Sequence, residues 1–85
     1  MILKCGNKTK PATLGTCILK NIHQEDIKIK CIGAAAVNQA MKAVSFANEK
    51  GKGILIGAFP FVKEEKIDER FCKIIVIDLY DLNGE

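Results

Sequence analysis

The sequence predicts a single α/β domain over residues 1–85, a two-layer sandwich in which two helices cover one face of a sheet. Three observations lead to this fold class. Six segments with strand or helix periodicity follow one another in the order β-α-β-α-β-β. Glycine-containing or charged breaks separate them, and 85 residues is the length of one small domain.

The first two elements are a short strand and a helix. The strand is predicted at Ile2–Cys5 and ends at Gly6-Asn7. The helix is predicted at Pro11–Ile22, because proline is tolerated in a first helical turn. Apolar side chains then recur at a spacing of four residues and form one stripe: Leu14, Ile18 and Ile22.

The next two elements carry the clearest periodic signals. Residues 27–32 alternate, with Ile27, Ile29 and Cys31 on one side and Lys28 and Lys30 on the other, which predicts a strand with one buried and one wet face.

Residues 34–50 predict a helix whose buried side is mostly alanine, since small side chains let a helix lie close to a sheet. Gly51 and Gly53 end this helix.

Two strands are predicted at the C-terminal end. Residues 54–62 are almost wholly apolar, as expected for a strand covered on both faces, although Pro60 indicates an edge or a bulge. The charged residues 63–70 are predicted to be a hairpin loop. The long β-branched segment 71–82 is predicted as the last strand.

This order leaves one sheet face without helices. Both β-α-β crossovers are expected to be right-handed, which places both helices on the same face. The apolar content of residues 54–62 then calls for another cover on the open face. A second subunit is the simplest candidate, and Phe46 on the flank of the second helix is expected to join that contact.

The charge distribution and the cysteines indicate the kind of ligand and the cellular compartment. Residues 1–52 hold nine lysines and three acidic residues, a net charge of +6, whereas residues 53–85 hold four basic and seven acidic residues, a net charge of −3. Such asymmetry steers an anion to one side. The four cysteines have no zinc-site spacing and lie in apolar stretches, which predicts free buried thiols and a cytoplasmic location, with a disulfide pair as the alternative. The sequence shows no signal peptide and no membrane span.

The basic residues before the first helix predict a phosphate site. Lys8 and Lys10 lie where the free N–H groups and dipole of a helix N-terminus already favour an anion. Asn38, Gln39 and Lys42 on the second helix extend this surface in our interpretation. The alternative is that these residues form only a solvated loop and a polar helix face. For Asn38, a further alternative is a role as a helix cap or a dimer contact.

Other groups give weaker signals. Lys28 and Lys30 are expected to be solvated or interfacial, and no aromatic stacking platform is predicted, because the phenylalanines read as core or interface. Cys17 and His23, six residues apart, lie on different helix faces, so no catalytic pair is expected. We predict a protein without enzymatic activity, cofactor or metal.

Two motifs carry a resemblance to known proteins. Gly6-Asn7-Lys8-Thr9-Lys10-Pro11 resembles the lysine-proline loop of the Alba superfamily, and the run from Ile32 to Val44 is very similar to the stage V sporulation protein S family. The resemblance covers nearly the whole chain, to about residue 82. It implies a mixed four-stranded sheet in spatial order 1-2-4-3, a homodimer, and DNA or RNA binding in a sporulation setting.

Two departures from the Alba pattern bear on function. The segment 31–34 has no charge where Alba proteins usually have arginines, and the basic and acidic residues of segment 63–70 nearly cancel. Weaker duplex-DNA binding than in archaeal chromatin proteins, or a different ligand, is therefore expected. The modest net charge and acidic hairpin also keep open an oligomeric regulatory or scaffold protein that binds protein partners.

Overall fold

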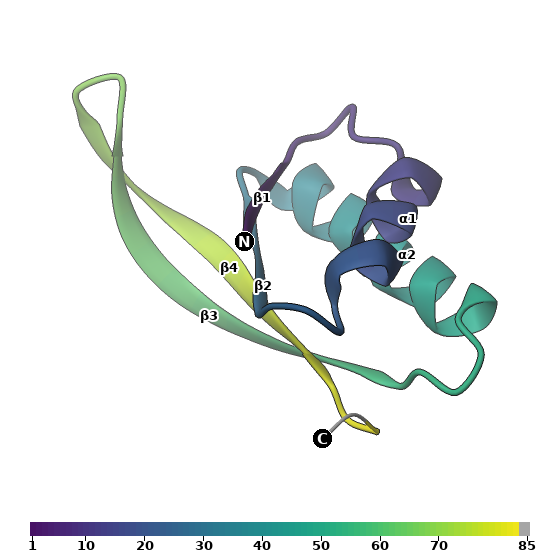
Figure 1. Ribbon diagram of the computed structural model, residues 1–85. Coiled ribbons are helices and arrows are strands. Elements are labelled where there is room, and N and C mark those ends of the chain that lie inside the picture. The colour runs from purple at the N-terminus through teal and green to yellow at the C-terminus, as the bar shows by residue number, and fades with distance from the viewer. Residues whose placement is uncertain (84–85) are drawn as a thin grey trace.

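The computed structural model describes residues 1–83 and contains six regular elements (Figure 1). In chain order they are β1 (Ile2–Cys5), α1 (Pro11–Asn21), β2 (Ile27–Cys31), α2 (Ala34–Lys50), β3 (Ile56–Ile67) and β4 (Arg70–Asp81). The four strands form one sheet in the order β1-β2-β4-β3. β1 and β2 are parallel, and the other neighbours are antiparallel. The predicted two-layer α/β fold and its strand order are confirmed.

The helix layer packs through small residues. The predicted stripe of Leu14 and Ile18 in α1 and Ile22 at its C-cap is buried, and α2 buries Ala36, Ala40, Ala43 and Ala47 completely. These short side chains allow the close approach that larger residues would block.

The two helices meet at a glycine. A Cβ atom on Gly15 would lie 2.6 Å from Cδ1 of Phe46 and 2.8 Å from the carbonyl oxygen of Ala43. Phe46, which the sequence analysis assigned to a subunit contact, therefore packs against α1 of its own chain.

The strand β2 shows the predicted alternation. Ile27, Ile29 and Cys31 are at most 1% exposed beneath the helices. Lys28 and Lys30 point to the opposite side of the sheet, because successive strand residues alternate between its faces. Both helices lie on one side of the sheet (Figure 1), so this opposite side is the open face.

The β3–β4 hairpin corrects the prediction for residues 63–70. These residues are not a loop: β3 runs on to Ile67 and β4 begins at Arg70. Asp68 and Glu69 alone form the turn, with φ angles of 49° and 65°. The hairpin projects beyond the helices (Figure 1), so its strands can carry polar side chains on both faces. A run of charged residues was therefore not a sign of a loop.

The burial of β3 in the single chain is low. This strand was expected to be covered on both faces, with a second subunit over the open one. Phe59, Phe61 and Val62 are 51%, 41% and 61% exposed in the described chain, and the subunit contact stays a prediction. Phe59 and Phe61 lie on the open face, which no helix covers, and Val62 lies on the helix side of the hairpin, which projects past the helix layer (Figure 1). The proline signal was correct, since Pro60 lies in β3, an edge strand of the sheet.

All four cysteines are free thiols, as predicted. Cys5 and Cys31 are buried, whereas Cys17 and Cys72 are half-buried. Burial raises the pKa of the Cys31 thiol to about 11. Within residues 1–83, no helix is long and apolar enough to cross a membrane.

Candidate nucleic-acid interface

The loop of residues 6–10, here called the basic loop, connects β1 to α1 and is closed by its own hydrogen bonds. The Gly6 N–H donates to Thr9 Oγ1 at 2.8 Å, and the Thr9 N–H donates to the Gly6 carbonyl at 3.2 Å. Lys8 and Lys10, on the two sides of Thr9 in the sequence, are exposed. Neither forms an ion pair with any residue of the described range 1–83. Their charges are therefore available to a ligand.

The basic loop leads into an uncapped helix N-terminus. Lys10 is the N-cap residue of α1, no side chain caps the helix, and its first turn has no acidic residue. The first intrahelical bond runs from the Leu14 N–H to the Lys10 carbonyl. The N–H groups of Ala12 and Thr13 therefore lack intrahelical acceptors, at the positive end of the helix dipole.

A hollow of about 430 Å³ lies beside the basic loop. It is lined by Lys8, Thr9, Lys10, Thr13, Leu14 and Cys17. Both predicted lysines and the first turns of α1 thus border one concave surface. The geometry suits an anion, since ammonium groups and a helix N-terminus lie together there.

The α2 residues of the predicted site divide into two kinds. Gln39 is half-buried, and its Nε2 donates to the Thr9 carbonyl at 2.9 Å, which ties the basic loop to α2. Asn38 and Lys42 are exposed, one turn apart on α2. Neither forms a hydrogen bond or ion pair with the basic loop in the part of the chain that the structure describes. The structure therefore brings Gln39, and not Asn38 or Lys42, to the two lysines.

The lysines of the open face are partly neutralised. Lys28 Nζ lies 2.8 Å from Asp78 Oδ1, and this hydrogen bond raises the pKa of Lys28. Lys30 donates to Glu65, and that hydrogen bond, with the charges of Lys63 and Lys4, holds the pKa of the Glu65 carboxyl below its ordinary value. These ion pairs neutralise part of the positive charge of the open face.

An aromatic group on the same face was missed by the sequence analysis. Phe59 and Tyr80 are 51% and 43% exposed, and their ring centroids lie 5.4 Å apart at 66°. Lys28 Nζ lies over the Phe61 ring, 5.6 Å from its centroid, in a cation–π contact. The spacing of two between Phe59 and Phe61 indicated a shared face. Of the two predicted roles of the phenylalanines, the core role is wrong for this pair in the described chain, and the interface role stays a prediction.

The residues considered for catalysis are engaged separately. Cys17 Sγ accepts a hydrogen bond from Asn21 Nδ2 at 3.7 Å, while His23 Nδ1 lies 3.2 Å from Asp81 Oδ2. Within residues 1–83, no three His, Cys, Asp or Glu side chains gather in a way that could hold a metal ion.

The fold and the basic loop together define an α/β protein of the Alba-like class. The family model described as stage V sporulation protein S (SpoVS) matches residues 1–80, and the chain belongs to this family of sporulation proteins. The predicted resemblance is thus confirmed at the level of family and fold. A comparison with curated proteins gives no match.

Proposed function

We propose that this sporulation-related protein binds DNA or RNA through the phosphate backbone, without strong sequence preference. The observation that carries the proposal is the pair of exposed ammonium groups, Lys8 and Lys10, beside an uncapped helix N-terminus. Lysine acts as a compact point charge on a flexible stem, so it attracts phosphate without reading base edges.

The α2 residues have different roles in this proposal. Gln39 is a positioning residue, because its amide nitrogen already holds the Thr9 carbonyl. Asn38 and Lys42 supply secondary contacts to a backbone that runs along α2, since both are exposed. The protein acts by binding and not by catalysis, and its four free thiols support a reducing compartment, the cytoplasm.

A homodimer is part of the same proposal. Met41 lies two turns before Asn48, which bonds to the N–H and the carbonyl of Ile56, so Met41 shares the α2 flank that faces β3. On the hairpin, Val62 and Phe71 lie on the helix side of the sheet and extend this apolar surface; they are 61% and 71% exposed. An apolar surface of this kind supports an isologous contact between two copies.

Charge reversal at the basic loop tests the proposal. The double variant Lys8→Glu/Lys10→Glu lowers the net charge from +3 to −1, and so does the matched control Lys52→Glu/Lys66→Glu at two other exposed lysines. Fluorescence anisotropy with labelled duplex DNA and duplex RNA is expected to show binding lost in the first variant and largely retained in the control. Equal losses in both variants would reduce the effect to net charge and contradict a site at the basic loop.

A scaffold that binds protein partners is the second candidate. It is favoured by the acidic turn at Asp68 and Glu69 and by the exposed Val62 and Phe71 on the same hairpin. Absence of binding to duplex DNA and RNA even at low salt, with an oligomer still formed, would favour this candidate over the first.

A further inference from the structure

We propose that the open face of the sheet is a second nucleic-acid surface, one that binds single strands by stacking bases on Phe61 and Phe59. This inference rests on the proposed function, because it assumes a nucleic-acid ligand, and it adds a strand form and a separate site. The basic loop holds phosphates at one end of α1, whereas this surface lies across the strands on the side away from both helices (Figure 1).

Three exposed rings come together on this face. Phe59 and Phe61 alternate with Pro60 along β3, and the register pairs Gly57 with Tyr80, so Tyr80 lies beside Phe59 on the same side. Strand geometry separates Phe59 and Phe61 by about 6.6 Å, roughly twice the rise of stacked nucleotides. The spacing therefore suits the splayed bases of a single strand, and it does not match the stacked bases of a duplex.

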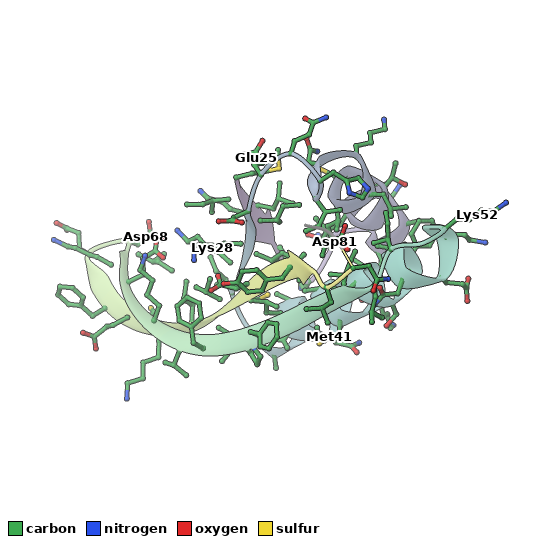
Figure 2. The ribbon with its side chains drawn as sticks, turned by 60° about the horizontal axis from the view of Figure 1, so that its bottom comes forward. Glu25, Lys28, Met41, Lys52, Asp68 and Asp81 are labelled. Carbon is green, nitrogen blue, oxygen red and sulfur yellow. The ribbon has the colours of Figure 1, made fainter. Side chains whose placement is uncertain are left out.

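Cations lie on the same sheet face as the rings, and Lys28, Lys30 and Lys63 line one hollow with Phe61, whereas Arg70 lies at the hairpin turn. The pairing places Lys4, Lys28, Lys30, Lys63 and Arg70 on the open face, against two strand carboxylates, Glu65 and Asp78. Lys28 lies on the open side of the sheet, opposite the side that holds Met41 (Figure 2). Excess positive charge beside exposed rings is the combination that sequence-tolerant single-strand binding surfaces use.

A hollow joins the rings to the cations. Its volume is about 320 Å³, and its walls are Ile2, Lys28, Lys30, Phe61, Lys63 and Val76. Val76 is the apolar wall at the bottom of this hollow. Like Ile74 on the same face of β4, it is only 3% exposed and stands apart from the helix-side core. A base inserted here would lie on the Phe61 ring with lysines at its edge.

A carboxylate bonded to one wall of the hollow, Lys30, keeps one acceptor without a donor. Glu65 forms its ion pair with Lys30 through Oε1, whereas Oε2 is buried and has no hydrogen-bond partner among the described residues. A base amino group or a ribose hydroxyl would supply a donor to this oxygen once the Glu65 side chain turns from its buried position into the hollow. The lowered pKa of Glu65 keeps the carboxylate in its accepting form.

Charge argues against a second copy as the occupant. An isologous contact brings the same surface of both copies together, so the excess of lysines on the open face would meet itself. The apolar surface of Val62 and Phe71 on the other side of the hairpin carries no such conflict. A polyanion with apolar bases satisfies both features of the open face.

A tryptophan introduced at the site gives a direct readout, because the chain has no tryptophan of its own. In Phe61→Trp, an oligothymidylate single strand is expected to quench the indole fluorescence as a base stacks on it. The control is Lys20→Trp, at an exposed position in the last turn of α1, in the helix layer on the other side of the sheet, where quenching is not expected. Circular dichroism checks that both variants are folded.

Affinity measurements complete the test. Phe61→Ala is expected to weaken oligothymidylate binding by at least about fivefold, as loss of one stacked base does. Duplex binding, which depends on the basic loop, is expected to change by less than that.

Three results would overturn the inference. The first is single-strand binding, seen by anisotropy, that neither quenches Phe61→Trp nor weakens in Phe61→Ala: it would remove the stacking site and leave the proposed function intact. The second is conversion of an oligomer to a monomer by Phe61→Ala, which would identify the face as a protein interface. The third is absence of binding to both single and double strands, which would overturn the proposed function together with this inference.

Discussion

The contact between α1 and α2 makes a quantitative prediction for Gly15→Ala. Alanine is favoured over glycine inside a helix by about 1 kcal/mol. Against this gain, the new methyl group would lie 2.8 Å from the Ala43 carbonyl oxygen and 2.6 Å from Phe46 Cδ1. The Phe46 ring can rotate away, but a backbone oxygen moves only with its helix, and overpacking of this kind costs typically about 1–3 kcal/mol.

Because two contacts, one of them to the backbone, are shorter than 3.0 Å, the cost lies in the upper part of this range, at about 2–3 kcal/mol. With the gain in helix propensity of about 1 kcal/mol subtracted, we expect Gly15→Ala to lower the free energy of unfolding by about 1–2 kcal/mol. For a domain of this size, the melting temperature would fall by roughly 4–15 °C. Urea unfolding followed by far-ultraviolet circular dichroism measures the change. Adding Phe46→Leu relieves the ring contact alone, so the double variant should recover only part of the loss.

Gly6→Ala is the matched control, since no atom lies within 4 Å of a Cβ at that position. Its stability is expected to stay within about 0.5 kcal/mol of the parent or to rise slightly. If Gly15→Ala were as stable as the parent, α1 and α2 could move apart to admit the methyl group without loss of stability. The argument that glycine fixes their close approach would then be refuted.

Three further predictions concern the basic loop, the hairpin and a buried thiol. Gln39→Leu removes the donor to the Thr9 carbonyl, so unfolding free energy should fall by about 0.5–1.5 kcal/mol; duplex affinity measured by anisotropy should fall as well, and unchanged affinity would contradict its positioning role. Glu69→Gly removes the strain of a left-handed residue at φ 65° in the hairpin turn, so the free energy of unfolding should rise by about 1 kcal/mol and the urea midpoint should rise with it. The pKa of Cys31 is raised from 9.0 to about 11, so above pH 9 the unfolded chain loses a proton that the folded chain keeps, and stability should fall as pH rises from 9 towards 11; Cys31→Ala should show a shallower fall in pH-dependent urea titrations.

Local periodicity was sufficient to predict most of the fold. The alternation of Ile27, Ile29 and Cys31 depends only on which strand face is buried, and α2 follows from the helical spacing of its alanines. The charged hairpin could not be assigned in this way. Its strands pair with each other beyond the helix layer, so their side chains carry no burial pattern to read.

The candidate site was predictable where it is local in sequence. Lys8 and Lys10 precede a proline-initiated helix, and that order alone places them at a helix N-terminus. The bond from Gln39 to Thr9 joins residues 30 positions apart, and the Phe59–Tyr80 pair depends on the β3–β4 register. Contacts of this kind are set by tertiary structure, which explains why the aromatic surface was missed.

The salt dependence of duplex binding tests the central claim most directly. If Lys8 and Lys10 each neutralise one phosphate, the slope of log K against log salt should become shallower by about 1.8 in Lys8→Ala/Lys10→Ala. The same substitutions at Lys52 and Lys66 should leave the slope of the parent protein unchanged. An identical slope with and without the two loop lysines would contradict the account, because the phosphates would then be held elsewhere.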